Sequence, residues 1–124
     1  MGKPLVSGLL LGTALCGGAW AQGSAAFDGQ YVGELALAKV ITGDCTQPAA
    51  GTAYPLTITG GQVSFKYVPR FDTALRGSVD TRGVVRAMAR VPKGSVRMTG
   101  HIEGRELIAE IESPSCNYTF RASR

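Results

Sequence analysis

The sequence predicts one all-β domain, a small antiparallel meander of about eight strands that forms a barrel or a two-sheet sandwich. Three observations support this fold class. Apolar and polar residues alternate with a period of two in short segments of residues 27–124, as they do in half-buried strands. Turn-forming glycines separate these segments at roughly even spacing. No segment shows the 3.6-residue period of an amphipathic helix, so we expect strands and turns alone.

The first strand is predicted to follow Phe27-Asp28-Gly29, with alternate side chains facing the interior. Those interior positions are Tyr31, Gly33, Leu35 and Leu37. Residues 42–53 contain glycines, a proline and a cysteine, a composition that favours a loop. We expect Cys45 to tie this loop to the domain.

The next two hairpins are marked by their turns. Gly60-Gly61 predicts a two-residue turn with Thr59 opposite Gln62. The segment Asp80-Thr81-Arg82-Gly83 has Asp at the first and Gly at the last position of a type I turn that ends in a glycine bulge. With that turn, residues 75–90 form a third hairpin that places small residues inside and arginines outside.

Residues 96–112 predict a fourth hairpin, with Glu103-Gly104 as its turn and His101 opposite Glu106. A turn one residue later would place Glu103 opposite Glu106, and repulsion between like charges disfavours that register. A proline-containing break then leads to a last strand, which begins at Cys116.

The residues predicted to face inward divide into bulky and small sets. The bulky set, from the two ends of the domain, is Tyr31, Tyr54, Phe65, Tyr67, Tyr118 and Phe120. The small set, from the third and fourth hairpins, is Gly77, Ala87, Ala89, Gly100 and Ala109. We expect the two sets to interdigitate in a packed core, because a small eight-stranded barrel has little spare interior. The alternative is that the small residues leave an apolar pocket, as in a lipocalin-like ligand carrier.

The N-terminal residues 1–21 have the pattern of a signal peptide. Lys3 provides a positive start, residues 5–16 are mostly apolar, and Ala19-Trp20-Ala21 matches an A-x-A cleavage site. We expect residues 22–26 to form a flexible lead-in and residues 27–124 the single domain. No later run approaches the ~18 apolar residues that a membrane span needs. The sequence therefore predicts an exported protein, periplasmic or secreted.

Cleavage after residue 21 would leave two cysteines, Cys45 and Cys116. An oxidising compartment would join them, because they have one possible pairing. No C-x-x-C motif is present to indicate a redox role. A structural disulfide that closes so long a loop is worth roughly 4 kcal/mol in the chain-entropy model.

Charge is distributed unevenly along the chain. Without Lys3, 12 of the 13 Lys and Arg residues remain against 9 Asp and Glu residues, a net charge of +3. Basic residues dominate 66–97 and acidic residues dominate 101–112. The residues predicted to share one outward face and to bind anions are Arg76, Arg86, Arg90 and Arg97. The alternatives are a solvated basic face and a ladder of surface ion pairs between strands of opposite sign.

Guanidinium groups bind phosphate and carboxylate well. An anionic lipid headgroup, an acidic polysaccharide or an acidic protein would therefore suit this face. Nucleic acid is not expected as a partner, because no exposed aromatic residues are interleaved with the arginines.

The sequence gives little support to catalysis. His101 is the single histidine, and its predicted neighbour Glu106 has no nucleophile beside it. One histidine and two oxidised cysteines cannot form a closed metal site. We therefore expect no catalytic residues, no metal and no cofactor, and predict a binding domain. The competing classes are a small-ligand carrier with an interior pocket and, less favoured, an enzyme.

Three motifs resemble those of small, uncharacterised exported β-proteins of proteobacteria. They are Phe27-Asp28-Gly29-Gln30-Tyr31, Val79-Asp80-Thr81-Arg82-Gly83 and Cys116-Asn117-Tyr118-Thr119-Phe120. In that group these are an F-D-G-x-Y opening, a G-x-V-D-x-x-G hairpin and a C-x-Y-x-F closing strand. The resemblance implies an all-β exported domain and brings no functional site.

Overall fold

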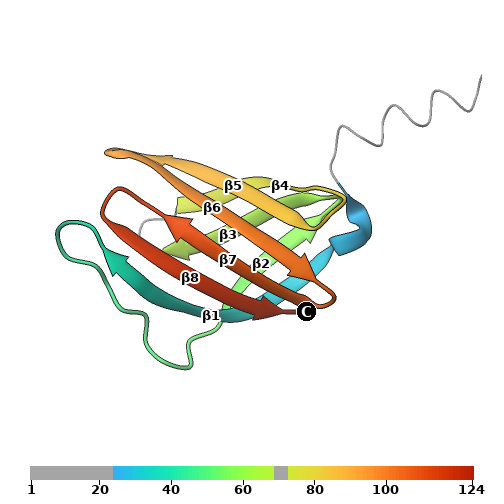
Figure 1. Cartoon of the computed structure of the whole chain (residues 1–124), viewed down its shortest axis with the longest axis horizontal. Coiled ribbons are helices and arrows are strands. Elements are labelled where there is room, and N and C mark those ends of the chain that lie inside the picture. Colours follow the sequence, from blue (N-terminus) through green and yellow to red (C-terminus); the bar gives the residue numbers. More distant parts are fainter. Residues whose placement is uncertain (1–23, 69–72) are drawn as a thin grey trace, which may run out of the picture.

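The computed structural model describes residues 24–68 and 73–124, which form a closed antiparallel barrel of eight strands (Figure 1). A short 3-10 helix, η1 (Ala25–Phe27), precedes the strands. The strands are β1 (Gly29–Val40), β2 (Tyr54–Thr59), β3 (Gln62–Val68), β4 (Thr73–Val79), β5 (Val84–Val91), β6 (Gly94–Glu103), β7 (Glu106–Glu112) and β8 (Cys116–Ser123). Each strand pairs with the next in the chain, and β8 pairs with β1. The predicted all-β meander is confirmed, and the barrel rather than the sandwich is formed.

The predicted signal peptide, residues 1–21, and residues 22–23 lie outside the described residues. Residues 24–26 of the predicted lead-in are described, and Ala25 and Ala26 belong to η1. The Ser24 side chain caps η1 by accepting a hydrogen bond from the Ala26 N–H at 3.2 Å. The Ser24 N–H donates to the Val79 carbonyl at 3.0 Å, so the chain is attached to the barrel from its first described residue.

The core is one cluster of inward-facing apolar side chains, as the alternation predicts. The largest fully buried members are Tyr31, Phe65, Phe120, Leu56, Ile58, Leu75, Met98, Leu107, Ile111, Val79 and Val85. Phe65 of β3 and Phe120 of β8 meet across the interior with their ring centroids 4.5 Å apart. Burial of each such side chain stabilises the fold by about 1.5–3 kcal/mol.

Three inward-facing glycines mark points where neighbouring strands come very close. A Cβ atom at Gly33 would lie 1.8 Å from the carbonyl oxygen of Arg121, and one at Gly77 would lie 1.8 Å from that of Arg86. At Gly100 it would lie 2.7 Å from the Cβ of Ala109. Glycine lets a sheet bend tightly enough to close a small barrel. At these positions the adjacent strand takes the space that a larger side chain would fill.

The second and third hairpins have the predicted registers. Thr59 lies opposite Gln62 across Gly60-Gly61, and Val79 lies opposite Val85 across the Asp80–Gly83 turn. The turn has the expected chemistry, because the Gly83 N–H donates to the Asp80 carbonyl at 3.1 Å and Gly83 has a φ of 86°. The hydrogen bond from the Val84 N–H to its carboxylate holds the pKa of Asp80 below its ordinary value.

The prediction for the fourth hairpin is wrong: the turn lies one residue later than predicted, which shifts the strand pairing by two residues. The turn is Gly104-Arg105, Glu103 lies opposite Glu106, and His101 lies opposite Ile108 rather than Glu106. Gly104 has a φ of 62°, and a non-glycine residue in that region costs roughly 1–2 kcal/mol. Two exposed carboxylates repel each other by less than that in water. Two-residue hairpin turns need a positive φ at their first position, which Gly104 fills in the observed turn and Glu103 would fill in the predicted one. The preference for glycine at that position therefore outweighs the repulsion, while the inward and outward faces stay as predicted.

One end of the barrel is closed by η1 and the residues after it. The Asp28 carboxylate accepts hydrogen bonds from the N–H groups of Gly60 and Gly61 at 2.7 and 3.0 Å. The Tyr31 hydroxyl donates to the Phe27 carbonyl at 2.8 Å. The Arg124 guanidinium donates to the Asp28 carbonyl at 2.7 Å. The F-D-G-x-Y motif thus has a structural role: its hydrogen bonds join the start of the domain to the β2–β3 turn and to the C-terminal residue.

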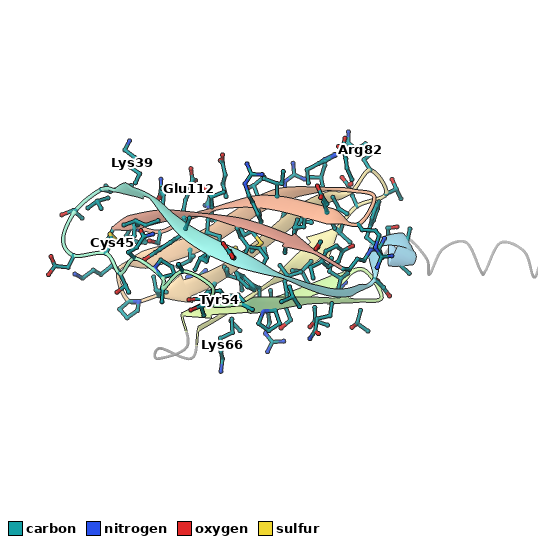
Figure 2. The ribbon with its side chains drawn as sticks, turned by 90° about the horizontal axis from the view of Figure 1, so that it is seen from below. Lys39, Cys45, Tyr54, Lys66, Arg82 and Glu112 are labelled. Carbon is teal, nitrogen blue, oxygen red and sulfur yellow. A yellow bond between two sulfur atoms is a disulfide. The ribbon has the colours of Figure 1, made fainter. Side chains whose placement is uncertain are left out.

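The opposite end holds the Cys45–Cys116 disulfide, which confirms the predicted pairing. It joins the loop between β1 and β2 to the first residue of β8, and the two Cα atoms are 5.8 Å apart. Figure 2 shows Cys45 at the end of the barrel away from η1. The Tyr118 hydroxyl donates to the Thr46 carbonyl at 2.9 Å, which adds a second attachment for the loop.

Candidate anion-binding face

The four predicted arginines lie on the outward face of β4, β5 and β6, around one exposed methionine. Met88 on β5 lies opposite Arg76 on β4 and opposite Arg97 on β6. Arg86 and Arg90 are two residues before and after Met88, so their side chains point outward on the same side of β5. All four arginines are exposed, and Met88 keeps 45% of its surface exposed. We call this set of five residues the arginine face.

Strand geometry gives the dimensions of the arginine face. Neighbouring strands are about 4.8 Å apart, and residues two apart along a strand are about 6.8 Å apart. The four arginine Cα atoms therefore surround the Met88 Cα at about 5–7 Å. A guanidinium group extends several ångströms beyond its Cα, so adjacent groups can contact one extended anion or neighbouring anionic groups on a surface.

None of these four guanidinium groups is part of an ion pair within residues 24–68 and 73–124. The pairs found there within 4.0 Å join Arg82 to Asp80 and His101 to Glu103. Glu112 on β7 lies opposite Arg97 in the sheet, yet the two form no such pair. In Figure 2, Glu112 projects from the outer surface of the barrel. Among the described residues, the arginine face therefore has no ion pairs of the kind that the alternative of a ladder between basic and acidic strands would require.

His101 lies on the exposed side of β6. Its Nε2 atom is 3.8 Å from Glu103, two residues along the same strand. The predicted partner, Glu106, lies opposite Glu103 instead. No group of three or more His, Cys, Asp and Glu side chains in the described part of the chain is placed to hold a metal ion.

A shallow groove on the outer surface of β1, β7 and β8 was not predicted from the sequence. The groove has a volume of about 660 Å³, and its lining includes Val32, Glu34, Glu106, Ile108 and Arg121. Val32 and Ile108 are 42% and 45% exposed. Both are apolar residues at positions where the alternation of apolar and polar residues predicts outward-facing side chains. These exposed apolar residues are the sequence feature that could have indicated the groove. Their proximity depends on β8 lying between β1 and β7, which only barrel closure creates.

Comparisons of the chain with protein-family models, with curated proteins and with solved structures found no match. Among the residues described, no helix is long and apolar enough to cross a membrane. The geometry and charge of the barrel surface are therefore the basis for a functional proposal.

Proposed function

We propose that this chain is an exported, non-enzymatic binding domain that recognises anionic groups through the arginine face. The observation that carries the proposal is the clustering of Arg76, Arg86, Arg90 and Arg97 around Met88 with no carboxylate partner within 4.0 Å among the described residues. Guanidinium groups have paired N–H donors that match phosphate, sulfate and carboxylate groups. An anionic partner would supply the acceptors that the barrel itself does not provide.

The expected affinity follows from the number of contacts. An arginine close to an anionic surface contributes about 1 kcal/mol at physiological ionic strength. Four such contacts amount to about 4 kcal/mol, or roughly a thousandfold in the dissociation constant. Because the groups are exposed, binding should weaken as added salt shortens the Debye length from about 10 Å at 0.1 M to about 3 Å at 1 M.

Three kinds of ligand fit this chemistry: an anionic lipid headgroup, an acidic polysaccharide and an acidic protein. Export restricts them to components of the cell envelope or its surroundings. The signal-peptide pattern of residues 1–21 supports export. The Cys45–Cys116 disulfide is compatible with an oxidising compartment.

The test compares the wild-type protein with a variant in which Arg76, Arg86, Arg90 and Arg97 are all replaced by Ala. Binding to heparin and to vesicles with an anionic lipid is measured at about 0.1 M NaCl. The matched control replaces the exposed residues Lys39, Arg82, Arg105 and Arg121 by Ala, which changes the net charge equally. The proposal predicts a large loss of binding in the first variant and a small one in the control. Equal behaviour of the two variants would refute it.

The carrier alternative has less support. Gly77 and Gly100 belong to the small-residue set that suggested an interior pocket, but close contact with the neighbouring strand accounts for both. Native mass spectrometry of the purified protein tests this alternative directly. A small molecule that co-purifies in stoichiometric amount would favour the carrier over the binding face.

A further inference from the structure

The outward faces of β5 and β7 have the same pattern with opposite charge. On β5 the exposed residues at alternate positions are Arg86, Met88 and Arg90, and on β7 they are Glu106, Ile108 and Glu110. Each set has an apolar residue between two like charges. The two apolar residues, Met88 and Ile108, are both 45% exposed. We call these sets the basic stripe and the acidic stripe.

The two stripes do not pair with each other among the described residues of one barrel. β6 lies between β5 and β7, which separates the stripes by about 9.6 Å, and both point away from the core. Among the described residues, none of the four charged members is in an ion pair. Each stripe is therefore available to a complementary surface on another molecule.

The groove beside the acidic stripe offers a place for the exposed methionine. Ile108 and Val32 provide apolar lining, and Glu106 and Glu34 add negative charge. Arg121 also lines the groove, and Glu34 lies opposite it in the sheet. A methionine side chain is unbranched and adapts to irregular apolar surfaces. The groove and acidic stripe together thus match an apolar side chain flanked by arginines.

We infer that the basic stripe of one copy of this chain docks on the acidic stripe and groove of a second copy. Met88 would enter the groove beside Ile108, while Arg86 and Arg90 pair with Glu106 and Glu110. Equal spacing along both strands, about 6.8 Å per step, allows the three contacts to form together. The inference rests on the proposed function, because it names a second copy as the acidic partner of the arginine face.

Such a contact joins two different surfaces. The assembly therefore keeps one unoccupied basic stripe at one end and one unoccupied acidic stripe at the other, and a further copy can add to either. Head-to-tail contacts of this type produce rings when the rotation closes and open chains when it does not. The strands that carry the stripes, β5 and β7, are each paired with a neighbour on both sides, so side chains rather than backbone hydrogen bonds must hold the copies together there. We expect weak, salt-sensitive assembly.

Sedimentation velocity over a concentration series, at low and at high salt, tests the inference. The wild-type weight-average sedimentation coefficient should rise beyond that of a dimer at low salt. Reversal of either stripe, with Arg86→Glu and Arg90→Glu or with Glu106→Arg and Glu110→Arg, should weaken association at least tenfold. All four substitutions in one chain should restore it. A wild-type protein that stays monomeric at every concentration, or a fourfold variant that is no better than either reversal, would overturn the inference.

Apolar substitutions separate the specific contact from general charge attraction. Ile108→Ser should weaken association severalfold without altering the net charge. The control is Ile41→Ser, because Ile41 is 52% exposed and lies outside both stripes and the groove. Association weakened equally by the two substitutions would count against docking at the groove.

The heparin assay distinguishes failure of this inference from failure of the proposed function. The Glu106→Arg and Glu110→Arg variant retains the whole arginine face, so it should lose self-association but not heparin binding. A wild-type protein that binds heparin through its arginines and remains monomeric would overturn the inference alone.

Discussion

Removal of the Cys45–Cys116 disulfide should destabilise the domain by about 4 kcal/mol. The bridge joins residues 71 positions apart. In the chain-entropy model, closing a loop of that length lowers the entropy of the unfolded chain by about 15 cal/mol/K, or about 4.4 kcal/mol at 25 °C. A domain of this size is typically stable by about 5–15 kcal/mol. Loss of the bridge should therefore remove a large share of the total stability.

The assay is unfolding of the wild-type protein and of the Cys45→Ala, Cys116→Ala variant, by guanidinium for the free energy and by heat for the Tm. For a domain of about 100 residues, each 1 kcal/mol shifts the Tm by about 4–8 °C, so a fall of at least 15 °C is expected. Tyr118→Phe is the companion variant, because it removes the hydrogen bond to Thr46 but keeps the bridge. The reasoning is refuted if the double-cysteine variant loses less than about 1 kcal/mol.

Three further predictions concern the barrel itself. Gly77→Ala should destabilise the fold by several kcal/mol, since its Cβ would overlap the Arg86 carbonyl; thermal unfolding will measure this, and a neutral effect would contradict the close contact. Asp28→Ala should cost about 2–4 kcal/mol, because two charge-assisted hydrogen bonds to the Gly60-Gly61 turn are lost; Asp44→Ala in the exposed loop is the control. The lowered pKa of Asp80 stabilises the fold above its ordinary value of 3.8, and this contribution disappears as the pH falls through the folded-state pKa. Unfolding of Asp80→Asn should therefore be less pH-dependent below 3.8 than wild type, and identical slopes would exclude this role.

Local turn chemistry explains which parts of the fold could be predicted from sequence. Gly60-Gly61 and the Asp80–Gly83 turn fix their registers through residues within a few positions, and both registers were correct. At residues 103–106 two registers gave the same inward and outward faces, so alternation could not distinguish them. The choice depends on two small energies, the repulsion between Glu103 and Glu106 and the preference for glycine at the first position of the turn, and the second is the larger.

Long-range pairing explains what the sequence could not predict. Barrel and sandwich share the same alternation, and they differ in whether β1 pairs with β8, two strands from opposite ends of the domain. The outward position of the arginines followed from alternation, whereas the central place of Met88 required the registers of both β4 with β5 and β5 with β6. The groove at Val32 and Ile108 arises only once the barrel is closed.

The salt dependence of heparin binding tests the role of the arginine face most directly. The logarithm of the binding constant should fall linearly with the logarithm of the salt concentration, with a slope that reflects the number of ion contacts. Replacing Arg76, Arg86, Arg90 and Arg97 by Ala should lower the affinity for heparin and bring the slope close to zero. The Lys39, Arg82, Arg105 and Arg121 control should retain most of the slope. A slope that is the same in both variants would show that binding follows net charge, and that the arginine face is not the binding site.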